Sequence, residues 1–175
     1  MTGVSAWQPL DRLLALLGIV RREGEHLIYS YQRVFPSPVT PEWVGGLEQD
    51  RERAERLEAF VSRYGRMQDT IADKLLPRWL AALAEPVGSQ IENLNRAERL
   101  GAVEDTIQWL EARKLRNRLV HEYAIDPADF AEDLNLAAVY TPMLVETYNR
   151  LRIDLAKRLG IGEDQLPPFL SFPAA

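Results

Sequence analysis

A regular spacing of apolar residues near the start of the chain constrains the fold more than any other feature. Between Leu10 and Val34, apolar residues recur at alternating steps of three and four, the period of an amphipathic helix. This helix is predicted to end at Phe35, because three prolines fall within the next six residues. Thr40 can cap a new helix with Pro41 at its first position. The stripe consists of Leu13, Leu17, Val20, Gly24, Leu27, Tyr31 and Val34.

The helical spacing returns in the rest of the chain, and no alternating pattern of useful length predicts a strand. Pro77 is expected to disturb or end the second helix, and Pro142 is expected to kink the last one. The further predicted helices lie within 47–75, 87–100, 104–119 and 127–160. The sequence therefore predicts an all-α fold, an up-and-down bundle of four to five helices.

The chain is expected to consist of one domain and a tail. Its 175 residues suit a single core, which we assign to residues 1–160. Residues 161–175 contain three prolines together with Phe169, Leu170 and Phe172. This tail is too interrupted for a helix and too apolar for an inert linker, so we expect it to pack against other parts of the protein.

Composition excludes several kinds of site. The absence of cysteine rules out disulfides and thiolate metal ligands, and the two histidines, His26 and His121, belong to no cluster with ligand spacing. We therefore expect no metal and no cofactor, and we place His26 on the surface of the first helix. The net charge of −5 argues against a broad positive field for long nucleic acids, so any contact with RNA must be local.

The sequence also indicates where the protein works. No segment approaches the roughly 18 consecutive apolar residues of a membrane span. The N-terminus lacks the basic start, short apolar run and cleavage site of a signal peptide. We expect a cytoplasmic protein without membrane contact.

The string Arg-Lys-Leu-Arg-Asn-Arg-Leu-Val-His-Glu-Tyr, residues 113–123, places four cations ahead of His121. Metal-free RNA cleavage needs a group that moves a proton off the 2'-hydroxyl or onto the leaving oxygen, and an imidazole can do this. It also needs positive charge beside the phosphorus, which the guanidinium of Arg116 can supply. Candidate RNA contacts are Arg113, Lys114 and Arg118.

The positions of these residues on a helix restrict how a site can form. Arg116 and His121 are five residues apart and would point about 140° away from each other on an ideal helix. Either the helix ends near His121, or the site forms at a two-fold axis where Arg116 of one protomer meets His121 of the other; we favour the second arrangement. Asn117 lies one turn before His121, and Tyr123 returns to the face of Arg116.

The pattern Arg116-Asn117-x-x-x-His121-x-Tyr123 resembles the signature of the HepT-like toxins in the HEPN superfamily. The resemblance covers roughly residues 67–159. It implies a homodimeric, metal-independent endoribonuclease in which Arg116, Asn117 and His121 are catalytic. It also implies a type VII-like toxin-antitoxin system, in which a nucleotidyltransferase antitoxin of the minimal (MNT) type adenylylates Tyr123 and blocks the neighbouring site.

Alternative functions remain for the same residues. His121 can be a residue that interacts with the negative end of a helix dipole, and Tyr123 can simply close a groove beside Arg116. The chain can also be a non-catalytic subunit that binds a nucleotide or a nucleotidyltransferase, or a scaffold that only dimerises. Trp109, seven residues before Arg116, is expected to form a wall of the groove or to pack in the dimer.

Overall fold

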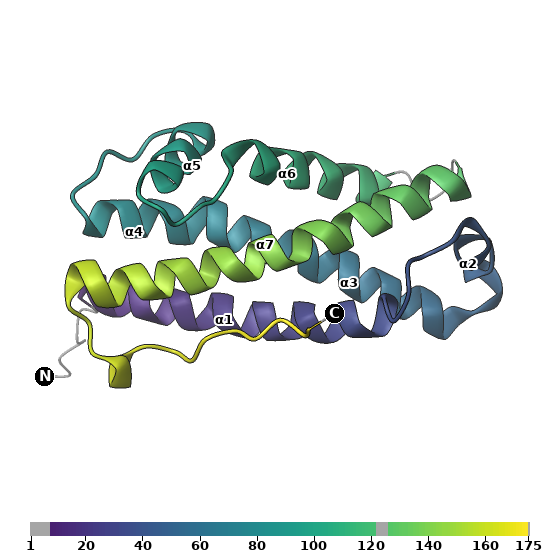
Figure 1. Ribbon diagram of the computed structural model, residues 1–175, viewed down its shortest axis with the longest axis horizontal. Helices are drawn as coiled ribbons and strands as arrows, with labels where there is room; N and C mark the ends of the chain where they lie inside the picture. Colours follow the sequence, from purple (N-terminus) through teal and green to yellow (C-terminus); the bar gives the residue numbers. More distant parts are fainter. Residues whose placement is uncertain (1–7, 122–125, 175) are drawn as a thin grey trace, which may run out of the picture.

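The computed structural model describes residues 8–121 and 126–174, except for the side chain of His121. Within this part every element is helical (Figure 1), so the prediction of an all-α fold is confirmed for it. The longest elements are α1 (Pro9–Val34), α3 (Arg51–Asp69), α6 (Thr106–His121) and α7 (Pro127–Leu159). None of the described helices is long and apolar enough to cross a membrane.

These four helices lie side by side, each antiparallel to the one before it (Figure 1). α1 packs against α3 and α7, and α6 packs against the same two helices. α1 and α6 therefore occupy opposite corners of the bundle, and the apolar stripes meet between them. The core includes Leu17, Leu27, Phe60, Leu115, Leu144 and Tyr148.

Local signals set the ends of the first helices. α1 ends at Val34, one residue before the predicted end at Phe35, which is its C-cap. The hydroxyl of Thr40 accepts a backbone hydrogen bond at 3.1 Å and caps α2 (Pro41–Gly45), which confirms the predicted start. A short 3-10 turn, η1 (Leu47–Gln49), leads to Asp50, whose carboxylate caps α3.

The second stripe is disturbed at Pro77 but does not end there. α3 continues into a π-helical turn, η2 (Thr70–Leu75), and then into α4 (Leu76–Ala82). In a straight α-helix a proline ring would clash with the carbonyl four residues earlier. The π turn, in which the N–H of Leu76 reaches the carbonyl of Ile71 five residues back, is wider and accommodates the ring.

Capping residues and glycines set the ends of the later helices. α5 (Gln90–Arg99) begins after Ser89, which forms a capping box with the third residue of the helix. α7 begins after Asp126, whose carboxylate accepts a backbone hydrogen bond at 2.9 Å, and it continues through Pro142. It ends at Gly160, whose φ of 64° is a left-handed value that glycine adopts readily.

Two tryptophans join helices through the core. The indole N–H of Trp79 donates to Asp154 at 2.8 Å, and that of Trp109 donates to the hydroxyl of Thr147 at 3.1 Å. The expectation that Trp109 forms a wall of an open groove or a dimer contact is wrong, because its side chain is 0% exposed. Trp109 is thus turned toward α7, and the spacing within α6 does not reveal this contact.

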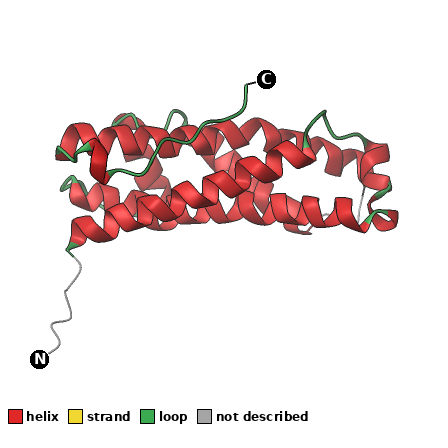
Figure 2. Cartoon of the chain, turned by 90° about the horizontal axis from the view of Figure 1, so that it is seen from below, coloured by secondary structure: helices red, strands yellow, loops and turns green. Residues whose placement is uncertain are grey.

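The C-terminal tail packs against the helices, as expected from its apolar residues. It crosses the bundle along α1 and α7 (Figures 1 and 2). Asn149 of α7 donates to and accepts from the backbone of Leu170, at 2.9 and 3.0 Å. The Leu170 side chain lies against Gly24 of α1 so closely that a Cβ at Gly24 would collide with it. Glycine in the first stripe therefore makes room for the tail.

Candidate functional site

The basic string lies on α6, and the core side of this helix determines where its cations project. Ala112, Leu115 and Leu119 are buried against the bundle. The cations therefore leave the helix at its sides and outer face, toward α3, toward α7 or into solvent. They do not form a single patch.

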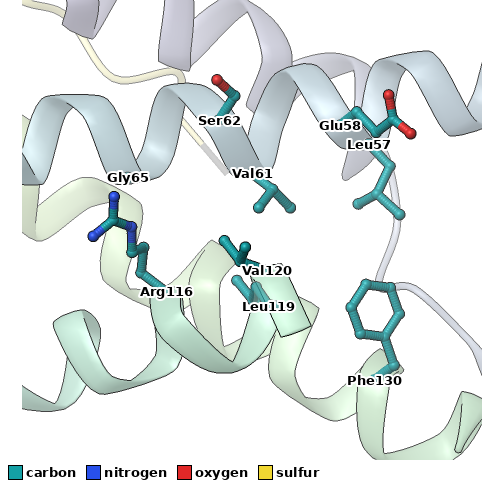
Figure 3. Close-up of a pocket in the computed structure, with 9 residues that line it drawn as sticks. All are labelled: Leu57, Glu58, Val61, Ser62, Gly65, Arg116, Leu119, Val120 and Phe130. Atoms are coloured by element: carbon teal, nitrogen blue, oxygen red, sulfur yellow. The ribbon is translucent and has the colours of Figure 1, made fainter. Parts of the chain in front are cut away.

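Arg116 projects toward α3 and lies across Gly65 (Figure 3). Its Nη2 forms an ion pair with Oδ2 of Asp69 at 2.8 Å, and its side chain is one third exposed. A Cβ at Gly65 would lie 2.9 Å from Nε of Arg116, which is closer than a side chain tolerates. Glycine at this position lets the guanidinium lie flat on the neighbouring helix.

Arg113 shares the same carboxylate. Its Nη2 lies 3.5 Å from Oδ1 of Asp69 and 3.7 Å from Oδ2 of Asp73. Its Nη1 is buried and makes no hydrogen bond within the described part of the chain. Asp69 thus holds Arg113 and Arg116, two of the candidate RNA-site cations, beside each other.

The other candidates lie elsewhere. Arg118 projects to the opposite side of α6, where it makes two hydrogen bonds to Asp133 of α7 at 2.9 and 3.1 Å. Lys114 is exposed and pairs with Glu111 at 2.8 Å. Asn117 is exposed on the outer face of α6.

The histidine and tyrosine of the motif lie at the edge of the described part. His121 is the last residue of α6, one turn after Asn117, and its side chain lies outside the described residues. Tyr123 belongs to residues 122–125, which also lie outside them. The meeting of Arg116 with His121 at a two-fold axis, and the return of Tyr123 to the face of Arg116, therefore stay predictions.

An open groove of about 470 Å³ runs between α3 and α6 beside Arg116 (Figure 3). Arg116 and Gly65 lie at one end, and Leu57 and Phe130 lie at the other. Apolar side chains from both helices line the middle, while Glu58 and Ser62 lie on the α3 side. The further lining residues are Val61, Leu119 and Val120.

A polar hollow lies on the other side of Arg116. It contains the exposed cations Arg66 and Lys74 and, in addition to Asp69 and Asp73, the half-buried carboxyl group of Glu23. Burial raises the pKa of Glu23, although Thr70 donates a hydrogen bond to its carboxylate at 2.9 Å. Arg116 is thus bordered by an apolar groove on one side and by a mixed-charge hollow on the other.

The chain matches no protein-family model, no curated protein and no solved structure in the comparisons made. The resemblance to the HepT-like toxins therefore depends on the motif itself.

Metal binding finds no support in these surroundings. No group of three or more histidine or carboxylate side chains within the described part is arranged to hold a metal ion. The carboxylates nearest the motif, Asp69 and Asp73, face arginines instead. What the site offers is a fixed guanidinium next to an apolar surface, which suits an anion with an apolar body.

Sequence reasoning found Arg116 but missed Gly65 and Asp69, which hold its side chain. Gly65, Asp69 and Asp73 follow one another at steps of four, the spacing of one helical face. That spacing is visible in the sequence. The orientation of this helical face toward α6 follows from the packing of the bundle, which the sequence does not predict.

Proposed function

We propose that this chain is a metal-independent endoribonuclease of the HepT-like type, a toxin that works as a two-fold homodimer in the cytoplasm. One observation carries the proposal: Arg116 is held by Gly65 and Asp69 at the end of an open groove, on the helix that ends at His121. A guanidinium fixed in advance at a surface accessible to a ligand is the arrangement that charge stabilisation on phosphorus requires.

The proposed reaction is a transfer within the RNA backbone. The 2'-oxygen forms a bond to phosphorus while the bond from phosphorus to the 5'-oxygen breaks, which leaves a 2',3'-cyclic phosphate and a 5'-hydroxyl. A His121 imidazole takes the proton of the 2'-hydroxyl or gives one to the leaving 5'-oxygen, and water exchanges the other proton. Arg116 stabilises the negative charge of the transition state, and Asn117 hydrogen-bonds to the phosphate or to His121.

Local positive charge supports contact with RNA in an acidic protein. Arg113, Arg66 and Lys74 lie around Arg116, and their charges are partly balanced by Asp69 and Asp73. Such a site binds a short stretch of RNA by a few contacts, and its affinity should fall as salt rises.

The decisive experiment is cleavage of RNA by the purified chain in EDTA. Arg116→Ala and His121→Ala should each lower the cleavage rate by at least about a hundredfold, with unchanged circular dichroism. Lys157→Ala, which removes an exposed cation at the far end of α7, should cleave like the wild type. Wild-type rates in both Arg116→Ala and His121→Ala would overturn the proposal.

Regulation by adenylylation of Tyr123 is part of the proposal. An added AMP would bring bulk and negative charge next to a site that has to accept phosphate. Co-expression with a nucleotidyltransferase partner of the minimal type should raise the intact mass by one or more AMP groups. Tyr123→Phe should abolish that increase.

One observation favours the alternative, a non-catalytic nucleotide-binding subunit. The charge of Arg116 is compensated by Asp69 within the same protomer, so Arg116 can serve as a binding group without any catalysis. Saturable nucleotide binding, measured by calorimetry on a chain that does not cleave RNA, would establish this alternative.

A further inference from the structure

The groove between α3 and α6 changes its chemistry along its length. Arg116 borders one end, the middle has apolar walls, and Glu58 borders the groove from the α3 side near Leu57. Among the described residues that line the groove, Arg116, Glu58 and Ser62 are the polar side chains.

We propose that this groove binds one nucleotide of the substrate strand, with its phosphate at Arg116 and a base bearing an exocyclic amino group held between Val61 and Val120, its edge toward Glu58. The inference rests on the proposed function for the identity of the ligand as part of an RNA. The groove itself is formed by one protomer.

The length of the groove fits this ligand. Gly65, on which Arg116 lies, and Glu58 are seven residues apart on α3, which corresponds to about 10 Å at the rise of an α-helix. This separation is comparable to that between the phosphate and the far edge of the base in one nucleotide. The volume of about 470 Å³ lies in the range of small-molecule sites.

The walls suit the flat faces of a base. Leu57, Leu119 and Phe130 are almost fully buried and form a fixed apolar surface, whereas Val120 is 56% exposed at the mouth. A base that enters would cover the exposed part of Val120 and remove apolar surface from water.

The charges select among ligands. A fatty acid would satisfy Arg116 but would bring no donor for Glu58. The amino groups of adenine, cytosine and guanine can donate to a carboxylate, and cytosine is recognised in this way by acidic side chains elsewhere. Uracil has no amino group, and its one edge donor, N3–H, is flanked by two carbonyl oxygens that would meet the carboxylate unfavourably.

The test is titration of the full chain with AMP, CMP, UMP and adenosine. Isothermal calorimetry measures the affinities, and the amide NMR signals of Val61 and Leu119 report binding in the groove. AMP and CMP should bind about 3- to 10-fold more tightly than UMP, the value of roughly one hydrogen bond. Adenosine, which lacks the phosphate, should bind about tenfold more weakly than AMP.

Two pairs of variants locate the site. Val120→Trp fills the groove and should weaken AMP binding by at least about tenfold, whereas Ile107→Trp, at a 71% exposed position of α6 outside the groove, should not. Glu58→Gln should remove the preference for AMP over UMP. Glu55→Gln, at an exposed neighbouring position outside the groove, should keep it.

The outcomes separate this inference from the proposed function. Nucleotide binding in the groove without RNA cleavage would keep the inference and overturn the nuclease. Equal AMP affinity in Val120→Trp and Ile107→Trp, or no response of the groove signals to any nucleotide, would overturn the inference. A change of oligomeric state in Val120→Trp alone would show that a second copy of the chain fills the groove, and it would also overturn the inference.

Discussion

A single glycine determines how the key arginine is presented. Arg116 can cross α3 because residue 65 has no side chain, and Asp69, one turn later, then meets its guanidinium. Both ion-pair partners are about one third exposed, so water screens the pair and its contribution to stability is small. Its main effect is on orientation, since it restricts a long side chain that would otherwise sample many rotamers.

Gly65→Ala should displace Arg116 while leaving the fold intact. The new Cβ would come within 2.9 Å of Nε, so the guanidinium has to move and its pair with Asp69 should break. Under the proposed function the cleavage rate should fall by about 10- to 100-fold. A change in the Nε–Hε NMR signal of Arg116 would report the displacement.

Gly18→Ala is the matched control for that substitution. A Cβ at Gly18 meets nothing within 4 Å, and alanine is the better helix former. The variant should be about 0.5–1 kcal/mol more stable than the wild type in urea unfolding. Its cleavage rate should not change, and an equal loss of cleavage in both variants would contradict the role assigned to Gly65.

Trp109→Phe should destabilise the junction between α6 and α7. The change removes the hydrogen bond to Thr147 and leaves a small cavity, because the indole is completely buried. We expect a loss of about 1–3 kcal/mol in the free energy of unfolding, measured with urea. No loss would show that Trp109 is not the anchor inferred here.

At the scale of elements, the tail is attached to the bundle through its backbone as well as through apolar side chains such as Leu170. Arg152 of α7 donates to the carbonyl of Pro167 at 2.6 Å, and Tyr148 donates to that of Pro168 at 2.8 Å. Burial raises the pKa of Tyr148 to about 12, so this hydroxyl stays protonated and able to donate at neutral pH. Arg152 also pairs with Glu163 at 2.6 Å.

Attachment of the tail should weaken in acid. The hydrogen bond from Arg152 holds the pKa of the Glu163 carboxyl group below its usual range. A carboxyl group whose pKa is lowered by folding stabilises the folded state above its unfolded pKa, and this effect disappears as the pH falls through the lowered pKa. Glu163→Gln should therefore unfold at a lower temperature than the wild type at pH 7, and this difference should vanish as the pH falls through the lowered pKa.

The elements were predictable where their signals are local. Thr40 and the prolines after Phe35 mark helix ends through their own backbone chemistry, and these predictions hold. Contacts between helices were not predictable in this way. Trp109 was assigned to an open face from its spacing to Arg116, but its indole is buried and donates to Thr147 of α7, and the spacing within α6 contains no information about α7.

At the scale of the whole molecule, two sides of the bundle differ in what covers them. The tail lies along α1 and α7, whereas no described segment covers the groove between α3 and α6 (Figure 2). The motif helix borders the uncovered groove. A dimer in which Arg116 of one protomer meets His121 of the other would place two such grooves about one symmetry axis.

Mixing two inactive variants tests this dimer. If each site takes Arg116 from one protomer and His121 from the other, a dimer of Arg116→Ala with His121→Ala contains one intact site. An equimolar, fully exchanged mixture should recover about a quarter of the wild-type rate, because half of the dimers are mixed and each has one of its two sites intact. No recovery, in a mixture that sedimentation shows to be dimeric, would place both residues of a site in one protomer.

The extra residue in the π turn η2 rotates the helical face after the turn relative to the face before it. Each residue rotates a helix by about 100°, so the residues before the turn can face α6 with Gly65 and Asp69 while those after it direct Trp79 to Asp154 of α7. A continuous α-helix without the π turn could make only one of these two contacts. Removing one residue from η2 would therefore rotate Trp79 away from Asp154 without moving Gly65. The contact of Arg116 with Gly65 and Asp69 can thus change independently of the hydrogen bond between Trp79 and Asp154.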